Sequence, residues 1–292
     1  MARSWLFVPG DSERKLAKAE ACGADVLILD LEDSVAPEHK AAARAQVREF
    51  LAARATQRPS QLWVRVNPVG GADCAADLAA VVAARPDGIV QPKTRSAADV
   101  DALGTQLDGL ERQHGLAAGA IHIVPIATET PAALFGMGGY AQCGGRLAGL
   151  TWGAEDLSVA IGATANQATD GAWTAPFQLA RSLCLFAAAA AGVAAIDTLH
   201  ADYRDDAGLG ASCAAARRDG FSGKLAIHPG QVSVINACFL PSAAEVSQAR
   251  RIVALFAAHP GAAALSLDGR MVDLPHLRQA QSILARAAGG AA

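Results

Sequence analysis

AIHIVPIATET, residues 120–130, is the stretch that decides the fold class, and LAGLTWGAED, residues 147–156, repeats its pattern. In each, a short apolar run stops at small residues and an acid follows, Glu129 in the first and Asp156 in the second. Continuous apolar runs of this length are typical of parallel strands that are covered on both faces. The carboxyl ends of parallel strands open on one face, so we expect the two acids on the same face.

Six further runs of this kind bring the number of expected strands to eight. The eight runs cover residues 4–10, 24–33, 62–68, 87–93, 120–130, 147–156, 193–201 and 224–230. Helix-like stretches between them are Glu13–Cys22, Pro37–Ala53, Ala72–Ala84, Ala97–Gln113, Pro131–Gly138, Pro176–Ala191 and Ala207–Asp219. Eight alternating strand–helix units predict an α/β protein with a closed (β/α)₈ TIM barrel. A doubly wound open sheet is the alternative, but residues 7–15, FVPGDSERK, lack the glycine-rich dinucleotide fingerprint that it would need.

The chain continues past the eighth expected strand, so we divide it into two parts. Residues 1–240 are expected to form the catalytic barrel, and residues 241–292 a C-terminal helix and lid segment. The second part has the pattern of a helix, a turn at residues 259–261, a short strand pair and an amphipathic helix. Such a segment is either a lid or arm that reaches a neighbouring subunit, or a helix that covers the barrel base.

Composition argues against several classes of protein. The net charge is −3 and its acids and bases are scattered, whereas a nucleic-acid partner would need a concentrated basic face. The six cysteines form no CxxC pair, which argues against a zinc site and a disulfide framework. The apolar run at residues 184–196 is shorter than a bilayer span, and the N-terminus is too short in apolar length for a secretory signal. We therefore expect a soluble cytoplasmic protein with no membrane partner.

Acids after three of the apolar runs indicate a metal site. Glu129 and Asp156 have no cysteine or histidine companion nearby, and Glu32 and Asp33 follow a third run, VLILDLED. Carboxylate oxygens without nitrogen or sulfur ligands suit a hard cation such as Mg²⁺. Each acid could instead cap a helix or lie in its first turn after a strand. Because three strand ends share the pattern, we favour a site.

Three basic residues also lie at expected strand ends. Arg65 ends the third strand, and its guanidinium is expected to face an anionic ligand, Glu32 or Asp33. Lys93 follows the fourth strand; among so many acids we expect an ion-paired lysine rather than a Schiff-base nucleophile. His228 follows the eighth strand in a His-Pro-Gly turn, where a structural role is favoured over that of a general base.

Two further groups of residues have open interpretations. Arg14, Lys15 and Lys18 lie in the turn and helix after the first strand, either as contacts for phosphate groups, such as those of coenzyme A, or as a solvated helix face. Asp273 lies alone in the C-terminal segment. It is either an acid or base delivered over a barrel mouth, or the cap of the helix that begins near Pro275.

Taken in order, seven segments resemble the citrate lyase β-subunit-like group of the HpcH/HpaI aldolase superfamily, which includes malyl-CoA, citramalyl-CoA and citryl lyases and malyl-CoA thioesterases. They are RSWLFVPGDSERKLAKA (3–19), GADVLILDLEDSVAPEHKAAAR (23–44), LWVRVNP (62–68), ATETPAAL (127–134), LTWGAEDLSVAIG (150–162), GFSGKLAIHPGQV (220–232) and DGRMVDLPHLRQAQ (268–281). The resemblance implies a (β/α)₈ barrel and a homotrimer or dimer of trimers. Residues 159–173 depart from the polar stretch that members often carry there.

The resemblance also implies roles for single residues. Glu129 and Asp156 match the Mg²⁺ ligands of the family, and Arg65 matches its substrate-binding arginine. Asp273 matches a lid aspartate that reaches the active site of the adjoining subunit. The pair at residues 32–33 matches acids around the water ligands of the metal.

The implied activity is a Mg²⁺-dependent retro-Claisen cleavage. A 3-hydroxy-3-carboxyacyl thioester of the malyl-CoA or citramalyl-CoA type would give a keto acid and an acyl-CoA. Arg65 would stabilise the enolate, Glu129 would also contact substrate, and the amides of Gly153 and Ala154 would hold the keto-acid carboxylate. The alternatives are the β subunit of a citrate lyase complex acting on a citryl acyl carrier protein, a malyl-CoA thioesterase, and a non-catalytic metabolite-binding paralogue.

Overall fold

The structure is a computed structural model that describes residues 2–56 and 58–289. The chain divides into two compact units: the larger is Ala2–Ile235, and the smaller begins at Asn236. The helix α9 (Gln231–Cys238) contains the boundary between them.

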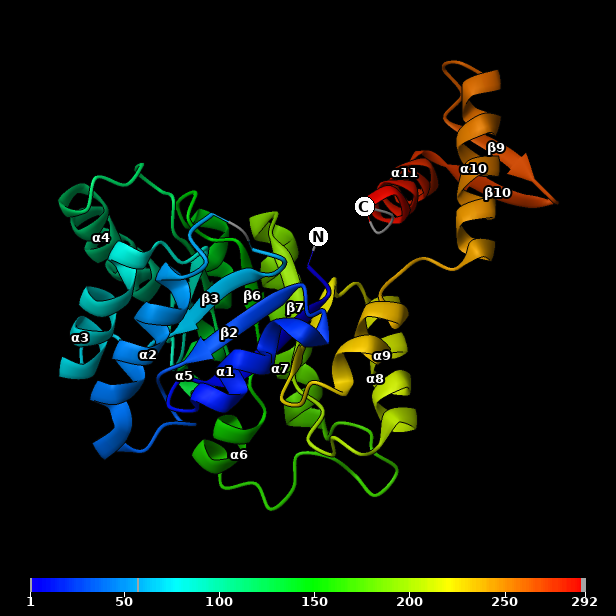
Figure 1. Ribbon diagram of the computed structural model, residues 1–292. Helices are drawn as coiled ribbons and strands as arrows, with labels where there is room; N and C mark the ends of the chain where they lie inside the picture. The colour runs from blue at the N-terminus through cyan, green and yellow to red at the C-terminus, as the bar shows by residue number, and fades with distance from the viewer. Residues whose placement is uncertain (1, 57, 290–292) are drawn as a thin grey trace. The chain divides into compact units, whose positions relative to one another are not determined.

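Eight parallel strands form the sheet of the larger unit. They are β1 (Ser4–Pro9), β2 (Val26–Asp30), β3 (Gln61–Arg65), β4 (Gly88–Gln91), β5 (His122–Pro125), β6 (Gly149–Thr151), β7 (Ala194–Asp197) and β8 (Gly223–Ala226). Their order is β5-β4-β3-β2-β1-β8-β7-β6. Parallel bridges from Ile123 to Leu147 and from Ile126 to Thr151 join the two end strands. The sheet therefore closes, and the predicted (β/α)₈ TIM barrel is confirmed, with its helices around the strands (Figure 1).

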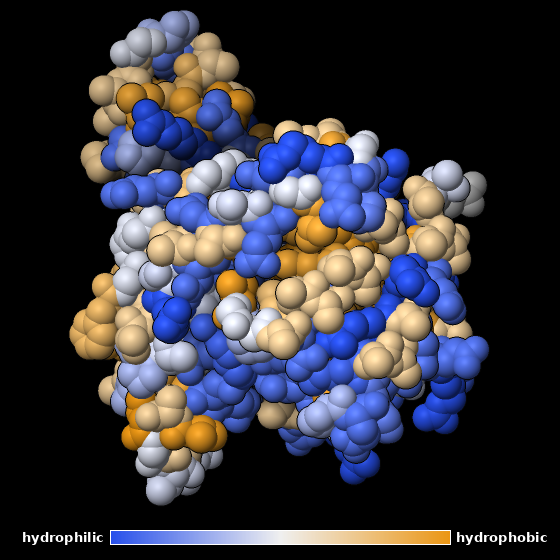
Figure 2. All heavy atoms as spheres, turned by 90° about the vertical axis from the view of Figure 1, so that its left-hand side faces the viewer, coloured by the Kyte–Doolittle hydropathy of each residue, from blue (hydrophilic) through white to orange (hydrophobic). Residues whose placement is uncertain are grey.

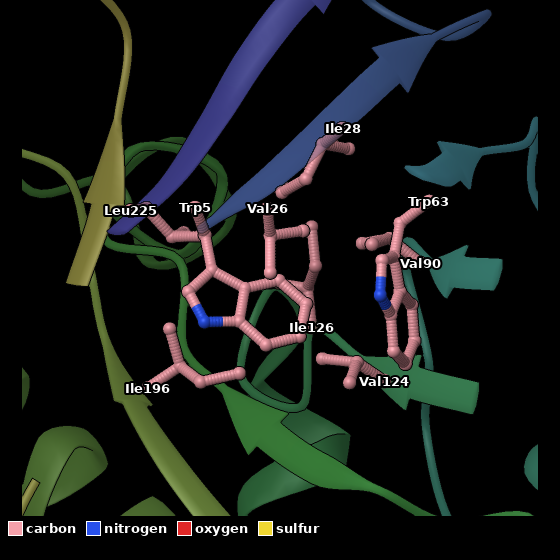
Figure 3. Packing of buried hydrophobic residues seen from close by; sticks show 9 residues of the cluster. All are labelled: Trp5, Val26, Ile28, Trp63, Val90, Val124, Ile126, Ile196 and Leu225. Atoms are coloured by element: carbon pink, nitrogen blue, oxygen red, sulfur yellow. The ribbon is translucent and has the colours of Figure 1, made fainter. Parts of the chain in front are cut away.

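Apolar side chains fill the interior of this barrel. Figure 3 shows the cluster, which consists of Trp5, Val26, Ile28, Trp63, Val90, Val124, Ile126, Ile196 and Leu225. The rings of Trp5 and Trp63 meet edge to face, with their centroids 5.1 Å apart. Gly88 makes room for the second ring, because a Cβ there would lie 2.2 Å from an atom of Trp63. The strand ends that carry the predicted site residues thus rise from a packed core.

Helices follow the strands in nearly the predicted ranges. In the larger unit they are α1 (Glu13–Ala19), α2 (Lys40–Ala52), α3 (Ala72–Val81), α4 (Ala97–Gln113), α5 (Pro131–Phe135), α6 (Glu155–Ile161), α7 (Ala175–Ala191) and α8 (Asp206–Asp219). The predicted ends of the first three helices are 3₁₀ turns, at Glu20–Cys22, Pro37–His39 and Val82–Ala84. The helix predicted at Pro131–Gly138 is wrong beyond Phe135, where the glycine-rich segment Met137–Gln142 forms a 3₁₀ helix instead.

The helix α6 carries one of the predicted site residues, but no helix was predicted there from the sequence. Glu155 and Asp156 both lie in its first turn, where a carboxylate interacts favourably with the helix dipole. Asp156 is therefore a first-turn residue, as the alternative interpretation has it. This position also keeps its side chain at the carboxyl end of the barrel, so the two interpretations do not exclude each other.

The smaller unit contains two long helices and a hairpin. They are α10 (Ala243–Ala258), β9 (Ala264–Leu267), β10 (Arg270–Asp273) and α11 (Leu274–Gly289). Ser242 and Glu245 form a capping box at the start of α10. The two strands pair antiparallel, and α10 packs against α11.

The surface of the larger unit is mixed in character. On the face in Figure 2, which looks onto the side of α3 and α4, hydrophilic residues (blue) are spread widely and apolar residues (orange) form separate groups. The helices on this side bury one stripe each; α3 buries Cys74, Leu78 and Val81. Among the described residues, no helix combines the length and the apolar character needed to cross a bilayer.

Candidate active site

Arg65 ends β3 beside Asp30, which ends β2, because the two are register partners in neighbouring parallel strands. Its Nε and Nη2 atoms donate to the two carboxylate oxygens of Asp30 at 2.7 Å each. Its Nη1 atom lies 3.0 Å from Oε2 of Glu32. The sequence predicts Glu32 or Asp33 as the partner of Arg65. The structure bears this out with Glu32, while Asp33 contacts Lys93.

The pairing with Asp30 keeps both groups charged. Burial would raise the pKa of Asp30, but the hydrogen bonds from Arg65 outweigh it and hold that pKa below its usual value. Burial would likewise lower the pKa of Arg65, and Asp30 raises it above its usual range. The guanidinium carbon also lies 4.7 Å from the centroid of the Phe7 ring. Arg65 is thus a fixed positive charge at the mouth of the barrel.

Lys93, which follows β4, lies among four carboxylates. Its Nζ atom is 2.6 Å from Asp156 Oδ1, 3.2 Å from Asp33 Oδ2, and 3.5 Å from both Glu32 Oε1 and Glu129 Oε1. Its backbone N–H donates to the other carboxylate oxygen of Glu129. The prediction of an ion-paired lysine is confirmed, and the acids predicted from three strand ends do lie together.

Two of these carboxyls have strongly raised pKa values. Burial raises the pKa of Glu129 to about 8, although Lys93 opposes the change. Burial also raises the pKa of Glu32 to about 7, against the effects of Arg65 and Lys93. The pKa of Lys93 is raised, because its acidic neighbours, Glu129 foremost, outweigh its burial. Acids that titrate near neutral pH in a cluster of charges are typical of a functional site.

The donor set at the mouth fits a hard divalent cation. Glu129 and Asp156 supply carboxylate oxygens near one point, and Mg²⁺ is commonly bound through one or two carboxylates, with water and substrate as the other ligands. Oε2 of Glu32 is buried and forms an ion pair with Arg65 at 3.0 Å, but it accepts no aligned hydrogen bond within the described part of the chain. Among residues 2–56 and 58–289, no group of three or more His, Cys, Asp and Glu side chains is arranged to hold a metal. The fit is therefore to a two-carboxylate site rather than to an all-protein cage.

A cavity of about 520 Å³ lies beside Arg65. Its lining brings Arg65 and Asp30 together with the three basic residues of the first turn and helix, Arg14, Lys15 and Lys18. The basic residues thus line the same cavity as the guanidinium, which favours anion binding over a merely solvated helix face.

The far part of this lining comes from the end of β8. His228 lines the cavity, and its ring stacks on Tyr203 with centroids 4.8 Å apart. Its Nδ1 atom accepts a hydrogen bond from the backbone N–H of Gly230 at 3.1 Å. The favoured structural role of His228 agrees with this turn geometry. Tyr203, its stacking partner, was not predicted from the sequence.

Gly153 and Ala154 connect β6 to α6. The N–H of Gly153 donates to Oγ1 of Thr128 at 3.0 Å, so this amide already has a protein partner. A Cβ at Gly153 would lie 3.1 Å from Cγ of Glu129, which explains why a glycine suits this place. Ala154 is buried and precedes the first turn of α6.

Asp273 belongs to the smaller unit, where it ends β10. Its Oδ1 atom lies 2.5 Å from Nδ1 of His276 and accepts the backbone N–H of the same residue at 3.4 Å. The hydrogen bond from His276 holds the pKa of Asp273 below its usual value. These contacts match the interpretation of Asp273 as a helix cap, and its carboxylate is half-exposed.

Lys40 is a positioning residue that the sequence analysis missed. Its Nζ atom donates to the carbonyls of Leu31 and Glu32 at 2.9 and 3.2 Å and to Oδ1 of Asn67 at 2.7 Å. It thereby fixes the loop that carries two of the four acids. A positive charge at the first position of a helix interacts unfavourably with the helix dipole. The unfavourable position of Lys40 at the start of α2 is the sequence signal that could have identified this residue.

Two family models match the chain. One, described as HpcH/HpaI aldolase/citrate lyase, matches residues 3–229. The other, described as a C–C bond lyase of the TIM-barrel fold, matches residues 186–289. Together they cover both compact units.

Several curated proteins are similar over nearly the whole chain. A citrate lyase subunit beta-like protein of Mycobacterium tuberculosis is 36% identical, covering 97% of this chain and 94% of that protein. A (3S)-malyl-CoA thioesterase of Cereibacter sphaeroides is 34% identical, covering 98% and 94%. The citrate lyase subunit beta of Haemophilus influenzae is 33% identical, covering 99% and 98%.

Solved structures agree with this likeness. The CitE protein of Mycobacterium tuberculosis, in complex with magnesium, acetoacetate and coenzyme A, is similar with a TM-score of 0.81 and 34% identity, covering 98% of both chains. A citrate lyase beta subunit from the same organism, complexed with oxaloacetate and magnesium, has a TM-score of 0.69 and 34% identity, covering 82% of this chain and 98% of that one.

Proposed function

We propose a reaction for this chain from the premise that it belongs to the HpcH/HpaI aldolase/citrate lyase family. It is a carbon–carbon lyase, and its substrate is a 3-hydroxy-3-carboxyacyl thioester of the malyl-CoA or citramalyl-CoA type. The observation that carries the proposal is the convergence of Glu129 and Asp156 on one cation, the Nζ atom of Lys93. Acids at different strand ends that share one cation can share a divalent ion.

The chemistry is a retro-Claisen cleavage. Mg²⁺ held by Glu129 and Asp156 would supply a Lewis acid for the hydroxyl and carboxylate oxygens of the substrate. As the hydroxyl loses its proton, the bond between the carbinol carbon and the α-carbon breaks. The electron pair moves to the α-carbon and thioester oxygen as an enolate, and a keto acid forms from the other half. A proton added to the α-carbon completes the acyl-CoA.

Arg65 is placed to act on the enolate. Its charge is held by Asp30, so it needs little reorganisation when negative charge develops on the thioester oxygen. The cavity beside it, with Arg14, Lys15 and Lys18 in its lining, suits the phosphate groups of coenzyme A. Coenzyme A is present in the similar CitE structure, which supports this assignment. The amide of Gly153 would contact a keto-acid carboxylate only by exchanging its bond to Thr128, so Ala154 is the simpler donor.

We assign the proton donor or acceptor at the α-carbon to Asp273, acting in a neighbouring barrel of a homotrimer or a dimer of trimers. The larger unit leaves apolar side chains exposed on α5, α6 and α7, and exposed apolar groups favour association. Phe135 is 94% exposed, Val159 84% and Phe186 66%. Light scattering coupled to gel filtration tests this proposal: trimers or hexamers support it, and a monomer at micromolar concentration contradicts it.

A cytoplasmic location accords with this chemistry. All six cysteines of the chain are free, and three of them are buried. Free thiols persist in a reducing compartment, where acyl-CoA substrates also occur.

Two other activities are suggested by the names of similar proteins, citrate lyase subunit beta and (3S)-malyl-CoA thioesterase, and one experiment distinguishes them from the lyase. The experiment is incubation of the chain with malyl-, citramalyl-, citryl- and hydroxymethylglutaryl-CoA, with Mg²⁺ or with EDTA, followed by mass spectrometry of the products. A keto acid plus an acyl-CoA, formed only with Mg²⁺, supports the lyase. Malate plus free coenzyme A indicates the thioesterase. Cleavage of a citryl carrier protein with no activity on CoA thioesters indicates the citrate lyase subunit.

A further inference from the structure

We propose that the ammonium group of Lys93 is the internal counter-ion of the metal site, and that it leaves Asp156 when Mg²⁺ binds. The proposal rests on the proposed function, because it takes Glu129 and Asp156 as the ligands. It adds that the metal and the lysine exchange at the same carboxylates, so that Lys93 lowers the affinity of the protein for Mg²⁺.

The position of the ammonium group is the first observation. Carboxylates from three loops approach it: Glu32 and Asp33 after β2, Glu129 after β5, and Asp156 in the first turn of α6. Like charges brought this close repel one another strongly unless a cation lies between them. In this structure Lys93 is the cation that contacts acids on all three loops, whereas Arg65 contacts only Glu32 among the four.

The backbone of Lys93 is the second observation. Its φ of 52° places a non-glycine residue in the left-handed region, which L-residues rarely adopt. In this conformation its N–H donates to one oxygen of Glu129 while its Nζ atom lies 3.5 Å from the other. A single residue thus contacts both oxygens of a predicted metal ligand, and the unusual backbone keeps it there.

Bonding distances make simultaneous occupancy unfavourable. Mg²⁺ lies about 2.0–2.1 Å from its carboxylate oxygens, and Nζ already lies 2.6 Å from Oδ1 of Asp156. An ion bonded to this oxygen and to Glu129 would face the ammonium group at close range, where two positive charges repel. Asp33, whose side chain is 58% exposed, already contacts Nζ at 3.2 Å. The long side chain of Lys93 can therefore turn outward onto Asp33 as the metal binds.

Calorimetric titration of the metal-free full chain with MgCl₂ tests the exchange. Lys93→Met removes the charge and keeps most of the side-chain length; Arg218→Met, at a largely exposed site on α8, is the matched control. We expect Lys93→Met to bind Mg²⁺ about ten-fold more tightly than the parent, and Arg218→Met to bind like the parent. Circular dichroism and thermal unfolding with saturating Mg²⁺ verify that each variant is folded.

A second measurement follows the ammonium group itself. The chain has five lysines, so the Nζ signals of protein made with ¹³C,¹⁵N-lysine can be resolved and assigned by substitution. On addition of Mg²⁺, the signal that is absent in Lys93→Met should shift, while that of the buried Lys224 should not.

The outcomes separate this inference from the proposed function. If the parent binds Mg²⁺ and Lys93→Met binds it equally or more weakly, with no shift of the Lys93 signal, the exchange is refuted and the lyase proposal stands. If neither protein binds Mg²⁺, both the exchange and the lyase proposal are refuted. Binding by Lys93→Met alone would mean that the ammonium group blocks the site outright, which supports the exchange and contradicts a magnesium-dependent parent enzyme.

Discussion

Two lysines of this barrel lie in clusters of opposite design. Lys224 on β8 is fully buried, and its Nζ atom donates to Asp197 at 2.9 Å. Asp197 also accepts from Nε1 of Trp152 at 2.7 Å and from Nε of Arg181 at 3.2 Å. Arg181 contacts Asp219 in turn, and Asp219 also lies 3.4 Å from the largely exposed Arg218, so both carboxylates are matched by cations. Among the described residues, Lys93 meets four carboxylates, of which only Glu32 has a second cation, Arg65, and the Lys93 side chain is 28% exposed.

The difference separates a structural cluster from a functional one. In the Lys224 cluster every carboxylate is paired with at least one cation, so a ligand could enter it only by breaking those pairs. The Lys93 cluster has an excess of negative charge and faces solvent, so a cation from solution can bind there. Both belong to one barrel, yet only the second should respond to Mg²⁺.

Removing one acid of the Lys93 cluster should abolish Mg²⁺-dependent turnover. For Asp156→Ala we expect a loss of about 10³-fold in kcat/KM, equivalent to about 4 kcal/mol. The fold should be retained, because the Asp156 side chain is 40% exposed and Lys93 keeps its contacts with three other acids. The measurement is product formation with Mg²⁺, together with urea unfolding.

Asp101→Ala, at an exposed position on α4, is the control and should keep parent activity. Full activity of the parent enzyme in EDTA would contradict the prediction.

Removing Lys224 from its cluster should instead damage the fold. Lys224→Met leaves Asp197 buried with one of its cations missing, so we expect a loss of about 3 kcal/mol in the free energy of unfolding. Urea unfolding measures this loss. Arg48→Met, at an exposed position on α2, should change it by less than about 0.5 kcal/mol. A loss below about 1 kcal/mol for Lys224→Met would mean that this cluster is not structural.

Asp273 tests whether the site extends beyond the barrel. For Asp273→Asn we expect kcat to fall about 10²-fold because the α-carbon loses its proton donor or acceptor. The Mg²⁺ affinity should remain that of the parent. Asp268→Asn, in the same hairpin, is the matched control and should be fully active. An unchanged kcat for Asp273→Asn would remove the smaller unit from the mechanism.

The pH dependence of stability should have opposite signs at the two clusters. The folded pKa of Glu129 is raised to about 8, so the folded state holds a proton that the unfolded chain releases near pH 4.5. In EDTA, the contribution of Glu129 to the free energy of unfolding is therefore present at low pH. It is lost as pH rises to 8, by about 1 kcal/mol per pH unit. Urea unfolding at pH 6, 7 and 8 should show this slope. In Glu129→Gln the slope should be flatter; an equal slope would contradict the assignment.

Asp197 should behave in the opposite way. Burial would raise its pKa, but Lys224 and Arg181 hold it below the usual value. Its contribution is present above the ordinary pKa of an aspartate and is lost only as pH falls through the lower folded value. The stability that Asp197 contributes should therefore be lost during acid unfolding below pH 4. The pH dependence in that range should be the same in Glu129→Gln as in the parent.

The sequence was a good guide where one strand or helix decides the outcome. Apolar runs predicted the eight strands, and acids after three of the runs predicted that residues 32, 33, 129 and 156 lie together. Contacts between side chains on two neighbouring strands were not predicted from the sequence. Asp30 looked like part of an apolar run, and only the register with β3 places it against Arg65. In the same way, Lys224 and Asp197 meet only because β7 and β8 are neighbours.

Backbone conformation set a second limit. No residue near Lys93 signals a left-handed φ at a non-glycine position, and that angle directs its N–H and its side chain to one carboxylate. For Asp273 the sequence offered a lid and a helix cap, and its contacts to His276 accord with the cap without bearing on the lid.

The paired indoles of Trp5 and Trp63 restrict the side from which small molecules can reach the site. Because their rings and the surrounding aliphatic side chains fill the barrel axis, small molecules reach Glu129 and Arg65 from the carboxyl end. Substrate arrives and both products depart along that one approach. A bulky thioester bound there would hinder the release of a smaller fragment held beneath it, so release should be ordered, with the thioester leaving first.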